Sequence, residues 1–244
     1  MVDLKEFEQK AADLRVLGMK ISIGQDTVYE KYWDEDCRRN IYSASKSFTS
    51  CAVGFAVQEG LIDLDERLVD AFKEDIPNNP DENLKKATVK DLLTMTLGQE
   101  KGFLMGKQRP RMEEQNWVKA SLAIPFVYEP GTHFVYNNVG PYLAGIMVQR
   151  RAGCDLLSYL TPRLLKPLGI RKTIWEVDPE GNTFGAGGLF LTVSELHKLG
   201  MFYLQDGCWN GKKLLSKEWI HESTRKQVEN NKNSYGYGYL FWGG

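Results

Sequence analysis

The residues that follow Ser43 form the pattern that most constrains the fold of this chain. Apolar side chains recur there at the spacing of one wide helix face. The members of this series are Phe48, Cys51, Ala52, Phe55 and Ala56. Such a series predicts a helix whose broad apolar face must be covered by other elements. Gly60 then supplies a helix stop, and a chain of 244 residues is long enough to bury the helix in a core.

The rest of the chain divides into segments of different periodicity. Helical spacing predicts a helix over 3–17, and alternation after Gly18 predicts a strand that turns at 24–26 into a second strand. From 63 to about 189 helical stretches dominate, separated by loops rich in Pro, Asn and Gly. The later predicted elements are helices over 192–203 and 214–223 and a strand within 235–242.

Charge and composition limit the classes of partner. The chain carries 31 basic and 32 acidic side chains, so its formal charge of -1 predicts no attraction to nucleic acid or an anionic membrane. The basic residues Lys107, Arg109 and Arg111 are followed at once by Glu113 and Glu114, which predicts a solvated surface turn. The sequence indicates no oligomeric state.

Cysteine spacing and the start of the chain bear on cofactors and targeting. The four cysteines form no C-x-x-C pair and are predicted to be buried or surface thiols. We expect neither a metal nor an organic cofactor, because no ligand cluster or phosphate-binding glycine loop is present. Residues 1–14 do not form a signal peptide and no stretch is apolar enough to span a bilayer, so we expect a cytoplasmic protein.

Ser43 and Lys46 have the spacing of a nucleophile and its base. A serine hydroxyl needs a base within hydrogen-bond reach to become nucleophilic at neutral pH. Residues three apart on a helix share a face, so Lys46 can reach Ser43. Burial beside the apolar helix would lower the pKa of Lys46 and supply the neutral amine. At the helix start, the Ser43 backbone N–H would also stabilise a developing oxyanion.

The same spacing occurs a second time, at Ser223 and Lys226, as expected by chance for so short a motif. Ser43 precedes a helix apolar enough to be buried, whereas polar residues follow Ser223 over 227–232. We therefore predict that Ser223 lies on the surface and that Ser43 is the nucleophile. A plain helix N-cap is the alternative role for Ser43.

A further candidate element is Tyr136-Asn137-Asn138, which follows a turn at 129–131. A phenol beside a lysine ammonium can titrate low and act as a general acid or base. Asn138 would orient the lysine or bind a substrate carbonyl. A Tyr and an Asn in a loop are more often structural, so this element gains weight only together with Ser43 and Lys46.

Together these residues resemble the S-x-x-K and Y-x-N motifs of the class C β-lactamase, DD-peptidase and esterase family, a branch of the penicillin-binding serine hydrolases. Other segments are similar to the family in the expected order. They are 41–49, 58–65, Asp91-Leu92-Leu93-Thr94-Met95-Thr96, Tyr128-Glu129-Pro130-Gly131, Lys166-Pro167-Leu168-Gly169 and Gly187-Gly188-Leu189. Met95 stands where the family usually has histidine. The resemblance covers nearly the whole chain.

The resemblance implies an α+β fold of the β-lactamase/transpeptidase type. An antiparallel sheet built from both chain ends would be flanked by helices, with a mostly helical lobe inserted. We expect one domain over 1–244, with a sheet-containing lobe over 1–60 and 190–244 and a helical lobe over 61–189.

The family's site residues carry over by position. The resemblance implies that Ser43 is the nucleophile, Lys46 its partner, Tyr136 the general base and Asn138 a substrate or lysine contact. No histidine is required. His133, His197 and His221 lack a convincing Ser-His-Asp arrangement and are predicted to be surface or satisfied histidines.

One family motif, K-T-G or H-x-G on a strand near the C-terminus, has no counterpart. Lys198-Leu199-Gly200 is the nearest string, but it lies within a predicted helix. Residues 235–239 resemble a segment that precedes the motif. We therefore expect a C-terminally truncated chain that lacks one oxyanion donor, a loss that typically costs about a hundred- to a thousandfold in rate. It would also leave an exposed sheet edge.

The predicted function is that of a serine hydrolase that forms an acyl-enzyme. Its partner would be a small-molecule or peptide acyl substrate: a β-lactam, a D-Ala-D-Ala type peptide or a small ester. The sequence does not separate these three. The alternatives are a truncated or catalytically impaired relative that binds acyl ligands without efficient turnover, and a structural interaction domain with accidental motifs.

Overall fold

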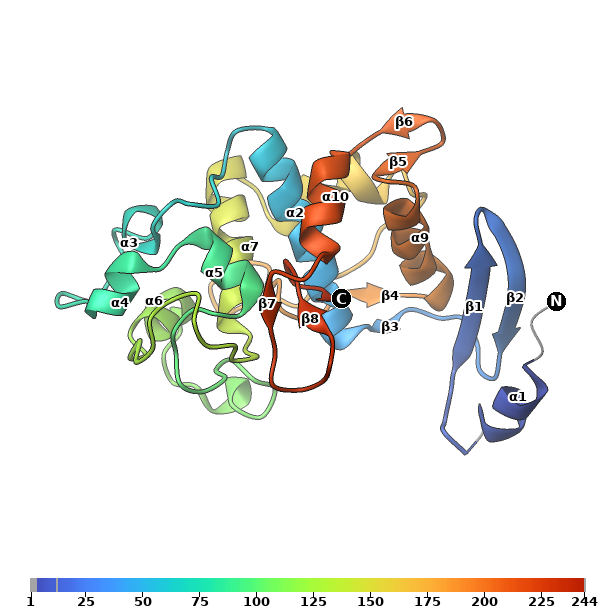
Figure 1. The fold of residues 1–244 in the computed structure, drawn as a ribbon, viewed down its shortest axis with the longest axis horizontal. Helices are drawn as coiled ribbons and strands as arrows, with labels where there is room; N and C mark the ends of the chain where they lie inside the picture. The colour runs from blue at the N-terminus through green and yellow to red at the C-terminus, as the bar shows by residue number, and fades with distance from the viewer. Residues whose placement is uncertain (1–3, 12, 244) are drawn as a thin grey trace.

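The predicted apolar helix lies at the centre of the molecule (Figure 1). The computed structural model describes residues 4–11 and 13–243. The helix, α2 (Ser45–Gln58), packs against α7 (Val139–Ala152), which is buried over most of its length. Every member of the predicted apolar series is at most 2% exposed. Just beyond α2, Gly60 adopts a left-handed φ of 71°, which confirms the predicted helix stop.

Short helices dominate the region between residues 61 and 189, as predicted. Besides α7 they are α3 (Leu68–Ala71), α4 (Glu82–Lys86), α5 (Val89–Thr94), η2 (Arg109–Arg111), α6 (Trp117–Leu122), α8 (Leu156–Leu160) and η3 (Thr161–Leu165). α5 begins at a capping box of Thr88 and Asp91 and packs against α7. Met95, where the family usually has histidine, is a buried C-cap of α5 with a φ of 62°.

The strands form four small antiparallel sheets in the described part of the chain. They are β1 (Gly18–Ile23) with β2 (Asp26–Tyr32), β3 (Arg39–Asn40) with β4 (Phe190–Leu191), β5 (Cys208–Trp209) with β6 (Lys212–Lys213), and β7 (Val228–Glu229) with β8 (Gly236–Tyr237) and β9 (Trp242–Gly243). The hairpin predicted around 24–26 is confirmed by β1 and β2. The two ends of the chain are joined in the β3–β4 sheet, where Arg39 pairs with Leu191. The β1–β2 and β7–β8–β9 sheets each pair strands that are close in sequence.

The two terminal predictions are corrected in detail. The strand predicted within 235–242 is two short strands, because Leu240 adopts a φ of 64° and the chain reverses between β8 and β9. The helix predicted over 3–17 is shorter, because α1 (Lys5–Ala11) gives way to a turn in which Arg15 has a φ of 54°. Residues 3 and 12 of that prediction lie outside the described residues.

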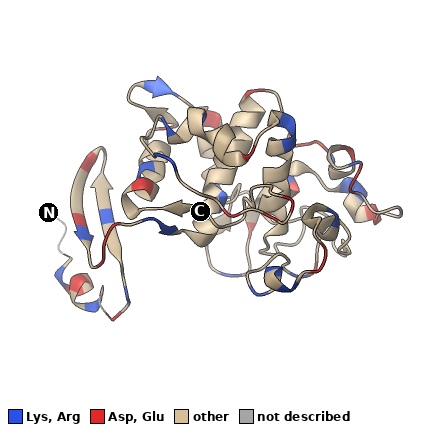
Figure 2. Ribbon diagram, turned by 180° about the vertical axis from the view of Figure 1, so that it is seen from behind, with Lys and Arg blue, Asp and Glu red and all other residues tan. Residues whose placement is uncertain are grey.

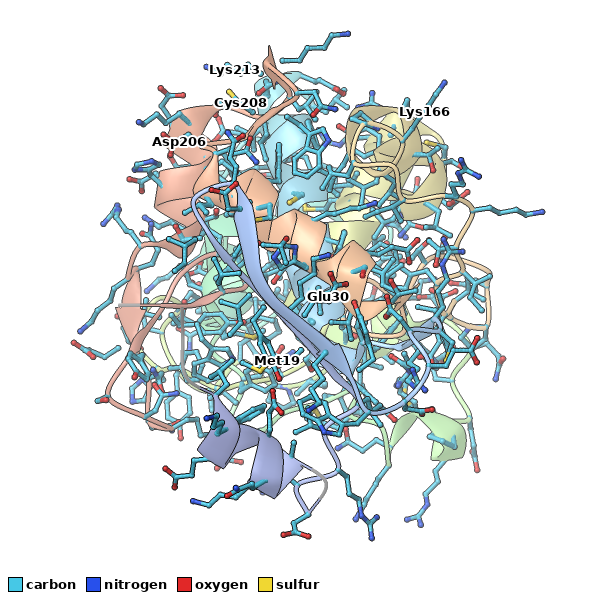
Figure 3. The ribbon with its side chains drawn as sticks, turned by 90° about the vertical axis from the view of Figure 1, so that its right-hand side faces the viewer. Met19, Glu30, Lys166, Asp206, Cys208 and Lys213 are labelled. Carbon is cyan, nitrogen blue, oxygen red and sulfur yellow. The ribbon has the colours of Figure 1, made fainter. Side chains whose placement is uncertain are left out.

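The β1–β2 hairpin lies at one end of the molecule, across α9 (Val193–Leu204) (Figures 1 and 3). The Tyr32 hydroxyl is 2.8 Å from Ser194 Oγ, and Ser22 Oγ is 3.0 Å from His197 Nε2. The hairpin therefore docks on α9 through side-chain hydrogen bonds.

Both predicted C-terminal helices are present. α9 follows a capping box formed by Thr192 and Glu195. α10 (Lys217–Thr224) begins later than the predicted residue 214, because Ser216 caps it by accepting from the Trp219 N–H.

Basic and acidic residues are interspersed over the molecule (Figure 2). Several pair across elements, as Arg163 does with Glu59 and Arg150 with Asp75. No helix within residues 4–11 and 13–243 is long and apolar enough to cross a membrane.

Candidate active site

Ser43 lies on a tight turn that presents it to solvent. The turn, η1 (Tyr42–Ala44), leads directly into α2, and Ser43 is exposed. Tyr42 adopts a positive φ of 47°, which is unfavourable for a residue with a side chain. Its N–H donates to Asn40 Oδ1 at 2.7 Å, and its carbonyl accepts from Ser45 Oγ at 2.6 Å. Because Ala44 is the N-cap residue of α2, the alternative N-cap role for Ser43 is not found.

Lys46 is buried beside Ser43, with 1% of its surface exposed. Its Nζ lies 3.1 Å from Ser43 Oγ, 2.8 Å from Asn138 Oδ1 and 2.6 Å from the Ala186 carbonyl oxygen. The structure therefore brings the two residues of the predicted pair together. Ser43 is exposed, whereas Lys46 is buried.

The three neighbours of Lys46 Nζ define how it can hydrogen-bond. The carbonyl oxygens of Asn138 and Ala186 can only accept, so each takes one N–H of the amine. A neutral amine has two N–H groups and one lone pair, and the lone pair then faces the Ser43 hydroxyl. A protonated amine has three N–H groups and donates to all three oxygens. The same geometry therefore suits both the neutral and the protonated form of Lys46.

The pKa of Lys46 is lowered to about 7, chiefly because burial penalises the charged amine and secondarily because of the positive charge of Arg109. An unperturbed lysine would be almost fully protonated at neutral pH. The amine of Lys46 is instead substantially neutral there, as a general base requires.

Tyr136 reaches the site from the loop that precedes α7. Its ring centroid lies 5.2 Å from Lys46 Nζ, and the ring stacks on Trp242 with 5.6 Å between centroids. Burial raises the pKa of Tyr136, while its hydrogen bond with Ser43 acts in the opposite direction. The possibility that this phenol titrates low is not supported, because burial outweighs the hydrogen bond. Tyr136 stays protonated near neutral pH and can donate or relay a proton.

Asn138 is the N-cap residue of α7 and is 8% exposed. Its Oδ1 accepts from Lys46 Nζ at 2.8 Å, and its Nδ2 donates to the Leu104 carbonyl at 2.9 Å. Of the two predicted roles, the structure shows the lysine contact. The second bond fixes the amide so that its oxygen faces the amine.

Residues of a glycine-rich segment over 184–188 line the same cavity as Ser43 and Asn138. Thr49 Oγ1 on α2 donates to the Gly185 carbonyl at 2.7 Å, which holds the segment beside α2 and places the Ala186 carbonyl on Lys46. Gly188 has a φ of 83°, and a Cβ there would lie 2.5 Å from Glu176 Cβ. In the sequence, Gly187 and Gly188 resemble the family's residues, but nothing there indicates that the Ala186 carbonyl accepts a hydrogen bond from Lys46.

Arg109 also lines the cavity beside Ser43. This cavity has a volume of about 420 Å³, and Asn138 and Glu176 are among its other lining residues. Its Nη1 lies 3.1 Å from Glu176 Oε2, and its side chain is only 24% exposed. The prediction of a solvated surface turn is therefore wrong for Arg109. The error arose because its partner is distant in sequence and the neighbouring glutamates suggested exposure.

The second Ser-x-x-Lys pair does not assemble. Ser223 is fully buried, so its predicted surface position is wrong; Oγ donates to the Ile220 carbonyl at 3.1 Å within α10. Lys226 lies beyond the end of the helix and pairs with Glu229.

The histidines have partners other than Ser43. His133 is bonded to Thr132, His197 to Ser22 and His221 to Asp206. The interpretation of each as a surface or satisfied histidine agrees with these contacts. All four cysteines are free thiols; Cys51 is buried, Cys208 is partly buried, and Cys37 and Cys154 are exposed.

The fold and the site arrangement agree with a comparison of the sequence to known families. The sequence profile described as Beta-lactamase matches residues 5–243, so the chain belongs to the β-lactamase family. The structure is similar to the octameric penicillin-binding protein homologue from Pyrococcus abyssi, with a TM-score of 0.78 and 22% identity over 99% of this chain and 65% of that chain. The predicted resemblance and the predicted α+β fold class are thereby confirmed.

Two curated relatives are acyl-handling proteins by name. The chain is 31% identical over 157 residues to the monacolin J acid methylbutanoyltransferase of Aspergillus terreus. The matched segment covers 56% of this chain and 37% of that protein. It is 31% identical over 150 residues to the lovastatin esterase of Penicillium rubens, which covers 52% of this chain and 37% of that protein. The matched part therefore spans well under half of the length of either relative.

Proposed function

We propose that this chain is an acyl-transferring serine enzyme in which Ser43 attacks a carbonyl carbon and Lys46 takes its proton. The observation that carries the proposal is the position of Lys46 Nζ, 3.1 Å from Ser43 Oγ and bonded to two carbonyl oxygens that leave its lone pair for the hydroxyl. The pKa of Lys46, lowered to about 7 by burial and then by Arg109, supports the same role.

The proposed acylation step involves Ser43, Lys46 and Tyr136. The O–H bond of Ser43 breaks as Oγ bonds to the carbonyl carbon of an ester, and the proton moves to Lys46 Nζ. Collapse of the tetrahedral intermediate breaks the bond to the leaving alcohol. Tyr136 gives its proton to that oxygen and receives one from Lys46, which returns to the neutral form. Water or an acceptor alcohol then attacks the acyl carbon and gives its proton to Lys46 Nζ. The bond between the acyl carbon and Ser43 Oγ breaks, Oγ takes the proton back from Lys46, and the released product is an acid or a new ester.

The start of α2 supports stabilisation of the negative charge that develops on the carbonyl oxygen. Backbone N–H groups in the first turn of a helix have no intrahelical acceptor, and the helix dipole is positive there. We propose the N–H of Ser43, which lies in the η1 turn that leads directly into α2, as one oxyanion donor. The expectation that a strand carrying a second donor is missing from the chain stays a prediction.

We take a small ester as the substrate class ahead of a β-lactam or a D-Ala-D-Ala type peptide. The names of the two relatives, an esterase and an acyltransferase, support this choice. The cavity beside Ser43, about 420 Å³ in volume, also suits a small acyl group.

The nucleophile is tested with a fluorescent fluorophosphonate, which labels activated serines, followed by peptide mass mapping. We expect the label on Ser43 and a loss of labelling rate of at least about a thousandfold in S43A. The matched control is S223A, which removes the serine of the other Ser-x-x-Lys sequence and should label at the wild-type rate. Label on Ser223 would contradict the proposal. A folded wild-type protein that binds an ester but takes no label would favour the impaired relative.

The substrate class is tested by comparing turnover of p-nitrophenyl butyrate, nitrocefin and a D-Ala-D-Ala peptide by the wild-type protein. We expect kcat/KM for the ester to exceed the other two by roughly tenfold or more. S43A supplies the background rate for each compound. A higher kcat/KM for nitrocefin or for the peptide would overturn the choice of an ester.

A further inference from the structure

Arg109 and Glu176 form an ion pair on the wall of the cavity that holds Ser43. Arg109 comes from η2, and Glu176 lies on a segment that runs beside Gly188, where the Glu176 N–H donates to the Gly188 carbonyl at 2.9 Å. The two side chains are 24% and 37% exposed, and the nitrogen-to-oxygen distance is 3.1 Å. Two parts of the chain that are distant in sequence thus place a cation on the wall of the cavity that Ser43 also lines.

The guanidinium of Arg109 is fixed from two sides. Its Cζ lies 4.2 Å from the centroid of the Phe184 ring, which is 1% exposed. On the other side, Glu176 is itself held by Asn40, whose Nδ2 donates to Oε1 at 3.3 Å. A cation restrained in this way keeps a constant position relative to the site, whereas a free surface arginine would be averaged by motion and screened by water.

The other described groups that face Lys46 carry no charge near neutral pH. Asn138 and Ala186 present carbonyl oxygens, Ser43 presents a hydroxyl, and Tyr136 is kept protonated because burial raises its pKa. The positive charge of Arg109 does act on Lys46, in the direction that disfavours the ammonium form. Glu176 is engaged by Arg109 and Asn40.

Resting on the proposed function, we propose that Arg109 is a positioning residue of this active site: its fixed positive charge keeps Lys46 in the neutral form that accepts the Ser43 proton. Arg109 does not touch the reacting atoms in this role. Like charges each disfavour the other's charged form, and the effect is larger where water is excluded, as it is at Lys46, which is 1% exposed. Glu176 holds the guanidinium in place.

The test measures how the rate of Ser43 labelling by the fluorophosphonate depends on pH in wild type, R109Q, R109K and E176Q. We expect R109Q to raise the midpoint by about half to one pH unit, which lowers the rate at pH 7 about two- to fivefold. The rate should recover at about pH 9, where Lys46 is neutral in both proteins. R109K restores a cation and should return the midpoint toward that of wild type. E176Q breaks the same ion pair but leaves the cation, so its midpoint should stay at or below that of wild type.

Two results would overturn the inference. One is an unchanged midpoint in R109Q, and the other is an equal rise in R109Q and E176Q, which would trace the effect to the lost ion pair. R109M, whose stem can still cover Phe184, replaces R109Q if thermal unfolding shows that R109Q is not folded. Absence of label on Ser43 in wild type would instead refute the proposed function, so the two failures are distinguishable.

Discussion

The chain contains Ser-x-x-Lys twice, and the two copies are opposite in burial. Ser43 is exposed and Lys46 is 1% exposed, whereas Ser223 is fully buried and the Lys226 side chain is 43% exposed. In the first copy the amine lies 3.1 Å from the hydroxyl. In the second copy the amine pairs with Glu229. A nucleophile must reach substrate and its base must lose water, so only the first copy has the burial that the chemistry requires.

The difference comes from where each copy lies on its helix. Ser43 belongs to a turn that continues into α2, so Lys46 is in the first helical turn and shares a face with it. Ser223 is near the end of α10, which stops at Thr224, so Lys226 is no longer helical. The spacing brings two side chains together only where helix spans both residues.

The largest effect that distinguishes the two copies is expected from removing each lysine. K46A deletes the proposed base and should lower the rate of Ser43 labelling by about a thousandfold. K226A removes the matching lysine of the other copy and should change the rate less than about twofold. Both rates are measured at pH 8 with the fluorophosphonate. Equal losses in the two variants would remove the distinction drawn here.

Tyr136 bonds Ser43 and lies over Lys46, and Y136F tests what its hydroxyl adds. The substitution deletes the hydroxyl that bonds Ser43 but keeps a ring that can stack on Trp242. We expect kcat for p-nitrophenyl butyrate to fall about a hundredfold, because the proton donor to the leaving alcohol is lost. W242F, which changes the ring packing around Tyr136 but keeps its hydroxyl, should have a much smaller effect. Wild-type kcat in Y136F would show that Tyr136 is structural.

A smaller, pH-dependent effect is expected from N138D. A carboxylate in place of the amide, whose oxygen lies 2.8 Å from Lys46 Nζ, would favour the ammonium and raise the pKa of Lys46. Labelling of Ser43 at pH 7 should fall about tenfold and recover as the pH rises. N137D alters the neighbouring asparagine, which has no hydrogen bond to Lys46, and serves as the control. An N138D rate that stays low at every pH would mean that geometry was lost instead.

The smallest effect concerns stability. Burial and, secondarily, Arg109 lower the pKa of Lys46 from 10.5 to about 7, so between these values the unfolded chain binds a proton that the native state does not. The contribution of Lys46 to the free energy of unfolding therefore rises with pH across that window, by up to about 1.4 kcal/mol per pH unit. Urea titrations at several pH values should show this slope in wild type relative to K46M. Wild type and K226M should give parallel curves; a parallel K46M curve would contradict the burial of a shifted lysine.

The sequence could predict those parts of the fold and site that depend on local spacing. The apolar series after Ser43 is set by helical periodicity, and the contact of Lys46 with Ser43 follows from a three-residue step. The sequence could not predict Arg109, because its contacts with Glu176 and Phe184 join segments that are distant along the chain. No local signal marks that pairing.

The burial of Ser223 and the partners of the terminal strands could not be predicted for a related reason. The polar residues after Ser223 lie beyond the end of α10, so they say little about Ser223 itself, whose carbonyl accepts from the Tyr239 N–H at 2.8 Å. Strand partners depend on contacts throughout the fold, so the separation of β1–β2 from β7–β8–β9 had no signature in the alternation of side chains.

The central claim, that a neutral buried Lys46 activates Ser43, is tested most directly by the pH dependence of Ser43 labelling in the wild-type protein. With a Lys46 pKa of about 7, the rate should rise with pH as a single titration, reach half of its maximum near that value and level off above it. K46A should lose both the rate and this titration. A wild-type rate that is independent of pH, or a K46A protein that keeps the same midpoint, would contradict the account.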